Sequence, residues 1–92
     1  MIIRLKAFAR FRDLLGGEMV VELPEGSTVF ELLKRLASRS TDLSDQIFDA
    51  SGKVKDDVNV MVKGRHFESL EGSETVLTDG DEVALFPVVV GG

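Results

Sequence analysis

The sequence predicts an α+β fold in which one main helix packs on one face of a mixed sheet of four to five strands. Short segments near both ends of the chain alternate apolar and polar residues with a period of two, as strands with one buried face do. Between them, residues 28–38 carry apolar residues at helical spacing. Because strand segments surround a single long helix, that helix must cover one face, and we expect the other face to be open to solvent.

The first half of the chain predicts a strand, a short helical turn, a second strand and the main helix. Residues 3–7 alternate and form the first strand, and residues 9–15 have the spacing of a short helix. Residues 19–23 predict a second strand, antiparallel to the first. Thr28 and Glu31 then fit a capping box at the start of the main helix.

The second half is less regular until its last strand. Residues 43–48 predict a short helical turn, and the alternating valines of residues 58–62 predict a strand that glycine ends. Residues 69–78 are interpreted as a loop. Residues 83–86 alternate again and predict the last strand, and we expect Pro87 to end its pairing because proline has no N–H.

Composition bounds the possible functions. The 92 residues suit one domain, which we divide into a folded body, residues 1–87, and a flexible C-terminal tail, residues 88–92. A net charge of −5 argues against nucleic acid as a partner, and the absence of cysteine excludes thiolate metal sites and a cysteine nucleophile on this chain. Since the sequence has no membrane-length apolar run and no signal peptide, we expect a cytoplasmic protein that is monomeric when alone.

The alternation places three large apolar residues on the open face. Ile3, Leu5 and Ala7 face the helix, so Phe8 faces outward, and the same parity turns Met61 and Phe86 outward. If the last strand lies between the other two, these three side chains cluster. Phe8, Met61 and Phe86 are called the open-face patch below. Such a patch on a charged face is typical of a protein-binding site; the alternative is that a loop covers it.

The chain ends in Gly91-Gly92, and this end is its most informative feature. Glycine has no Cβ, so such an end can enter a channel too narrow for other residues and offer its carboxylate to a partner enzyme. The alternative is that two glycines simply fray at a chain end.

Other polar residues have weaker functional signals. We interpret His66, the only histidine, as a solvated loop residue near the patch rather than an interface residue. Asp79 is interpreted as part of an Asp-Gly turn, and Asp81 and Glu82 as solvated side chains rather than a cation site. Arg10 and Arg12 fit either a partner contact or an ordinary charged surface equally well.

Three segments together resemble the MoaD/ThiS family of ubiquitin-like sulfur carriers. The first two are the Phe-Ala-Arg-Phe-Arg-Asp-Leu-Leu-Gly opening at residues 8–16 and the Leu-Pro-Glu-Gly-Ser-Thr-Val helix entry at residues 23–29. The most specific is Leu-Thr-Asp-Gly-Asp-Glu-Val-Ala-Leu-Phe-Pro at residues 77–87 followed by the terminal Gly-Gly. The sequence departs from the family in having Val88-Val89-Val90 where a second proline often stands, and Lys63 where the family often has asparagine.

The resemblance implies a β-grasp fold with the first and last strands parallel and adjacent. It also implies that an activating enzyme of the ubiquitin-activating type, which supplies the ATP and magnesium site, adenylates the Gly92 carboxylate, and that sulfur transfer gives a thiocarboxylate. The body and tail residues that would meet partners are Phe8, Met61, Phe86, Pro87, Val88, Val89, Val90 and Gly91. On this resemblance we expect the chain to bind no cofactor or metal itself and to be a non-catalytic carrier on its own.

Three roles stay open on this basis. The first is a sulfur carrier for molybdopterin biosynthesis, whose partner would be the molybdopterin synthase large subunit and which would count as that enzyme's small subunit. The second is a protein modifier joined through Gly92 to lysines of other proteins, as small archaeal modifiers are. The third is a passive β-grasp interaction domain whose tail does nothing.

Overall fold

The computed structural model describes residues 1–88. Its elements in chain order are β1 (Ile2–Ala7), α1 (Arg10–Leu15), β2 (Glu18–Glu22), α2 (Val29–Ala37), α3 (Thr41–Ile47), β3 (Val58–Val62), β4 (Arg65–His66), the 3-10 turns η1 (Phe67–Ser69) and η2 (Gly72–Glu74), and β5 (Glu82–Pro87).

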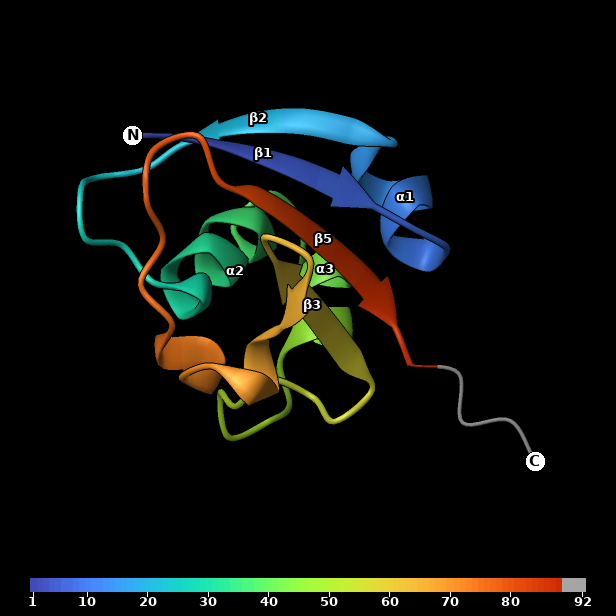
Figure 1. The fold of residues 1–92 in the computed structure, drawn as a ribbon. Helices are drawn as coiled ribbons and strands as arrows, with labels where there is room; N and C mark the ends of the chain where they lie inside the picture. The colour runs from blue at the N-terminus through green and yellow to red at the C-terminus, as the bar shows by residue number, and fades with distance from the viewer. Residues whose placement is uncertain (89–92) are drawn as a thin grey trace.

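The strands form one mixed sheet of order β2-β1-β5-β3-β4 (Figure 1). The two terminal strands, β1 and β5, lie side by side and parallel at its centre, with Leu5 opposite Val83. The other neighbouring pairs are antiparallel. The predicted α+β class and mixed sheet are confirmed, and β5 lies between β1 and β3, as clustering of the open-face patch requires.

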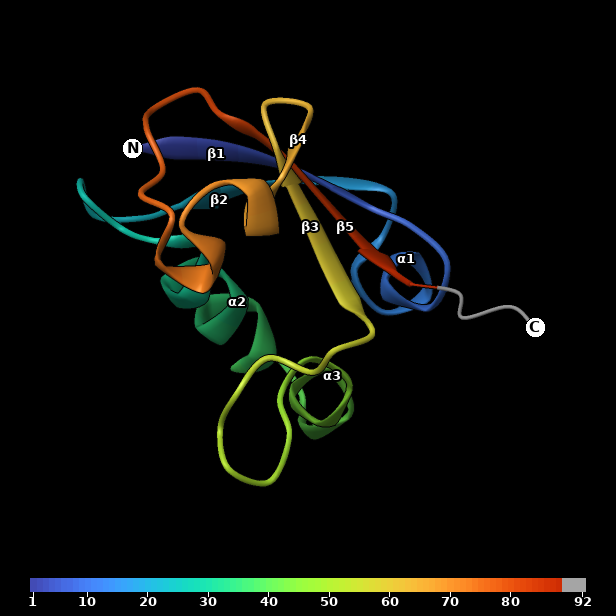
Figure 2. The same ribbon diagram turned by 60° about the horizontal axis from the view of Figure 1, so that its bottom comes forward.

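The helices α2 and α3 lie together on one side of the sheet (Figure 2). Inward-facing residues of β1 alternate with exposed ones, and α2 contributes four buried side chains, Val29, Leu32, Leu33 and Leu36. Burial of these side chains between helix and sheet is the main stabilising contribution, at about 1.5–3 kcal/mol for each large one. Within residues 1–88, the longest helices fall short of the length and apolar character that crossing a membrane demands.

Capping residues set where both helices begin. Thr28 has an extended backbone, and its hydroxyl oxygen accepts a hydrogen bond from the Glu31 N–H at 3.3 Å, which confirms the threonine half of the predicted capping box. The Glu31 carboxylate reaches back to the Thr28 hydroxyl, 3.4 Å away, rather than to the Thr28 N–H. Ser40 caps α3 in the same way by accepting from Leu43 N–H at 3.1 Å. This cap explains why α3 begins at Thr41, two residues before the turn that the apolar spacing predicts.

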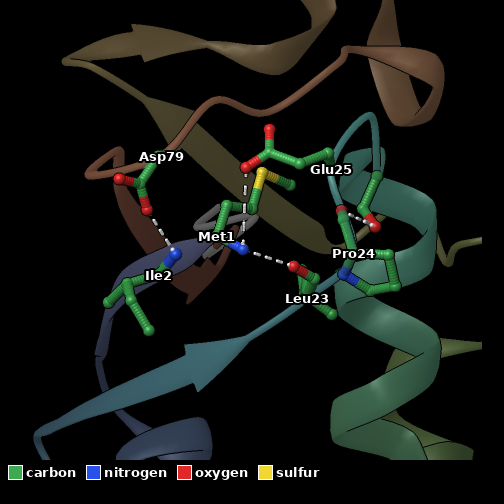
Figure 3. A network of polar contacts seen from close by, with 7 residues as sticks. Met1, Ile2, Leu23, Pro24, Glu25 and Asp79 are labelled. Carbon is green, nitrogen blue, oxygen red and sulfur yellow. Dashed lines mark hydrogen bonds and ion pairs between the residues drawn. The ribbon is translucent and has the colours of Figure 1, made fainter.

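The start of β1 is held by a polar network at one end of the sheet (Figure 3). The Met1 amino group donates to the Leu23 carbonyl at 2.7 Å and lies 3.9 Å from the Glu25 carboxylate. The Ile2 N–H donates to the Asp79 carboxylate at 2.6 Å. This network lies at the end of the sheet opposite to the one from which the chain leaves β5 (Figure 1).

Candidate partner-binding face and C-terminal arm

Two aromatic rings of the open-face patch meet where β1 and β5 end. Phe8 follows β1 and continues its parallel ladder, because its N–H donates to the Leu85 carbonyl at 3.0 Å. The Phe8 and Phe86 ring centroids are 6.4 Å apart in an edge-to-face arrangement, and Phe8 is 44% exposed. The structure therefore places an edge-to-face aromatic pair, in which Phe8 is partly exposed to solvent, on the face away from α2.

The third member, Met61, lies on β3 on the same face. It pairs with Ala84 of β5 on one side and with His66 of β4 on the other, and it is half-buried. Since Ala84 and Phe86 are two residues apart on one strand, Met61 and Phe86 are diagonal neighbours on the sheet. The structure thus places the three predicted patch residues on one face of the sheet, with Met61 one diagonal position from Phe86.

His66 belongs to a strand, so its interpretation as a loop residue is wrong. Its Nδ1 lies 2.9 Å from the Asn59 side-chain oxygen, and its ring centroid is 6.3 Å from that of Phe86. It is exposed and borders the open-face patch. The sequence feature that would have predicted this strand is the Lys63-Gly64 pair between β3 and β4. Both residues have positive φ, as a two-residue hairpin turn requires, and that turn folds His66 back beside Met61.

The C-terminal tail, residues 88–92, is called the C-terminal arm below. The strand pairing of β5 with β3 continues through Pro87 to Val88, the first residue of this arm. Pro87 lies within β5 opposite Val58, and the Val88 N–H donates to the Asp57 carbonyl at 2.7 Å. The prediction that Pro87 ends the pairing is therefore wrong. The bonds from Lys63 N–H to the Glu82 carbonyl and from Val88 N–H to the Asp57 carbonyl put Pro87 at a position of the antiparallel ladder where no N–H points to β3, so its missing N–H costs no bond to that strand. The predicted tail residues Val89, Val90, Gly91 and Gly92 lie outside the described residues.

Asp81 is buried, so its interpretation as a solvated side chain is also wrong. Its carboxylate accepts from the Thr78 N–H at 2.8 Å and hydroxyl at 2.9 Å, and Lys63 Nζ lies 3.3 Å away. Burial acts to raise the pKa of Asp81, but these hydrogen bonds and the Lys63 charge outweigh it, so the pKa lies below its ordinary value. Both oxygens of the Asp81 carboxylate therefore already have partners within this chain, Thr78 and Lys63. Across residues 1–88, His, Asp and Glu nowhere gather in the groups of three or more that could hold a metal ion.

Comparison with known proteins shows the family to which this chain belongs. Residues 5–92 match the ThiS family. The chain belongs to the ThiS family. It is 36% identical over 93 residues to small archaeal modifier protein 3 of Haloferax volcanii, with 100% of both chains covered. It is 33% identical over 91 residues to the molybdopterin synthase sulfur carrier subunit of Escherichia coli, covering 99% of this chain and 100% of that relative.

Solved structures of ThiS-like proteins share the fold. Small archaeal modifier protein 1 of Haloferax volcanii superimposes with a TM-score of 0.84 at 28% identity, covering 100% of both chains. The crystal structure of the Amycolatopsis orientalis BexX/CysO complex contains a chain that matches with a TM-score of 0.75 at 28% identity, covering 98% of this chain and 99% of that one. The expected β-grasp fold is confirmed, and this chain is a ubiquitin-like member of the sulfur carrier and modifier family.

Proposed function

We propose that this ThiS-family chain is a sulfur carrier whose Gly92 carboxylate is adenylated and converted to a thiocarboxylate for molybdopterin biosynthesis. The observation that carries the proposal is the geometry around β5. The same strand holds Phe86 in the open-face patch and continues, through Pro87 and Val88, into the Gly-Gly end of the chain. A partner that binds the patch therefore also receives the arm.

The chemistry requires little from this chain beyond presentation of the carboxylate. An activating enzyme of the ubiquitin-activating type would supply ATP and magnesium, and the Gly92 carboxylate oxygen would attack the α-phosphorus of ATP and release pyrophosphate. A sulfur nucleophile would then displace AMP from the acyl-adenylate. The similarity to the molybdopterin synthase sulfur carrier subunit of Escherichia coli extends over nearly the whole chain. This similarity supports the proposal that the sulfur is donated to the pterin precursor in the molybdopterin synthase large subunit.

A second role has its own support. The 36% identity with small archaeal modifier protein 3 extends over the whole of both chains. In that role a lysine amine of a target protein, rather than sulfur, would take the acyl group and form an isopeptide bond. Both roles share the activation of Gly92, whereas a passive interaction domain would need no activation.

Intact mass measurement of the protein isolated from its native host separates these roles. A carrier will show an exchange of oxygen for sulfur at the C-terminus, an increase of about 16 Da, that iodoacetamide alkylation then labels. A modifier will instead appear in larger conjugates in which Gly92 is joined to a target lysine; because Arg65 is the last Lys or Arg of the chain, trypsin leaves the whole segment 66–92 on that lysine. Protein that shows neither form, while its pathway is active, would contradict both proposals and leave the passive domain.

A further inference from the structure

Two charged side chains bridge the end of the sheet from which the arm leaves. Arg10 is the first residue of α1, and Asp57 directly precedes β3. Arg10 Nη2 donates to Asp57 Oδ2 at 2.9 Å. The Arg10 guanidinium carbon also lies 4.8 Å from the centroid of the buried Phe11 ring, which restricts the orientation of the guanidinium.

Asp57 holds the arm with its main chain while its side chain holds α1. Its carbonyl accepts the Val88 N–H at 2.7 Å, and its carboxylate accepts from Arg10. The bond from Val88 is the next hydrogen-bonded position of the β3–β5 ladder, so it extends the pairing one residue beyond β5 and restrains the chain there. Asp57 thus connects three separate parts of the fold at one point: α1, the entry to β3 and the end of β5.

We propose that Arg10 and Asp57 form a positioning clamp that fixes where the C-terminal arm leaves the body and so aims the Gly92 carboxylate during activation. The inference rests on the proposed function. Four residues follow Val88 in the sequence, and four residues span at most about 14 Å. The position and direction of Val88 therefore limit the volume that the carboxylate can reach. Fixing a reactant near its attack geometry lowers the barrier of the reaction.

A clamp and a direct partner contact predict different kinetics. If the clamp only aims the arm, breaking it leaves the open-face patch and hence partner binding unchanged, so kcat of adenylation falls while KM for this protein stays constant. If Arg10 instead touches the activating enzyme, its loss raises KM, and no second substitution within this chain restores it.

Charge-matched variants make the test specific. Arg10→Gln and Asp57→Asn each break the ion pair, and the double substitution Arg10→Asp with Asp57→Arg restores it in reverse. Arg39→Gln and Glu25→Gln are the controls, because they change the net charge by the same amounts in exposed side chains away from the arm. Glu25 lies in the network at the opposite end of the sheet (Figures 1 and 3).

The measurements are ATP–pyrophosphate exchange with the activating enzyme of the same organism and amide hydrogen exchange at Val88. We expect kcat to fall about two- to fivefold in both single variants, because one part-exposed ion pair contributes modestly. The Val88 amide should exchange faster by a similar factor. Both values should recover in the charge-reversed pair, and neither should change in the controls.

Other outcomes overturn the clamp. Faster Val88 exchange with unchanged kcat would show that the ion pair orders the arm without aiding activation. A raised KM that the charge reversal does not restore would assign Arg10 to direct partner contact. In both cases the wild-type protein is still activated, so the proposed function stands. Absence of exchange with the wild-type protein would contradict the proposed function, and with it the clamp.

Discussion

At the scale of single residues, Phe8 is the side chain that best separates binding from stability. It is 44% exposed and its packing includes the edge-to-face contact with Phe86. Phe8→Glu should weaken binding to the activating enzyme about tenfold or more, as the loss of an aromatic interface anchor does. The free energy of unfolding should fall by only about 1 kcal/mol, since one aromatic pair is lost. Calorimetric titration and urea denaturation measure the two quantities.

Val20→Glu is the matched control for this prediction. Val20 is 63% exposed and lies on the same face of the sheet, but on edge strand β2 away from the open-face patch. Its substitution should leave binding unchanged. Equal loss of affinity in both variants would show that the effect is not specific to the open-face patch and would contradict its role in binding. Extensive unfolding of Phe8→Glu would show that the Phe8 ring is needed for the stability of the core.

Residue parity was a reliable guide to which side chains face outward, but not to which polar groups are buried. The period of two predicts the exposed positions of β1 and places Phe8, Met61 and Phe86 on one face. The burial of Asp81 is different. Its carboxylate accepts from Thr78, three residues earlier, and also faces Lys63, which is distant in sequence and reaches Asp81 only because β3 and β5 pair. A local pattern carries no information about such a contact.

At the scale of elements, Asp81 connects the entry of β5 to the turn between β3 and β4. Its carboxylate accepts from Thr78 and faces Lys63, whose own N–H donates to the Glu82 carbonyl at 3.1 Å. Asp81→Asn removes the charge from this buried junction, so the free energy of unfolding at pH 7 should fall by about 1–3 kcal/mol. Glu82→Gln, an exposed neighbour of the same charge, should change it by less than about 0.5 kcal/mol.

The pH dependence follows from the direction of the Asp81 pKa. Hydrogen bonds and Lys63 lower it in the folded state from its ordinary value of 3.8. The unfolded chain therefore binds the proton first as the pH falls. The stabilisation is complete above the unfolded-state pKa and is lost on acidification toward the folded-state pKa. The difference between wild type and Asp81→Asn in urea denaturation should be constant from pH 6 to 8 and shrink below about pH 4. A difference independent of pH would contradict this origin.

The turn between β3 and β4 shows how a short signal fixes a distant contact. Lys63 and Gly64 both have positive φ. In the sequence, only the glycine indicates that such a conformation occurs here. Reading the pair as a two-residue hairpin predicts β4 and the position of His66, whereas reading it as a strand end predicts a loop. The helix caps at Thr28 and Ser40 are more local, and the first of them is evident from its spacing to Glu31.

At the scale of the whole molecule, the order of the strands is the part that local patterns cannot supply. Alternation identifies strands and their faces, but the parallel pairing of β1 with β5 joins residues almost the whole chain apart, such as Leu5 and Val83. That pairing was expected from the family resemblance, and the structure agrees with it. It is also what brings Phe8 to Phe86 and places the open-face patch beside the root of the arm.

The division into a folded body, residues 1–87, and a C-terminal arm, residues 88–92, stays a prediction. Deletion of Gly92 tests whether the end of the arm is needed for activation but not for stability. Among the described residues, the last one in the buried core is Leu85, seven residues before Gly92. Deletion should therefore change the free energy of unfolding by less than about 0.5 kcal/mol. It should abolish ATP–pyrophosphate exchange, because the carboxylate then lies about 3.5 Å short of its position. A truncated protein that retains exchange and function in cells would contradict both the carrier and the modifier roles, since each acts through the Gly92 carboxylate.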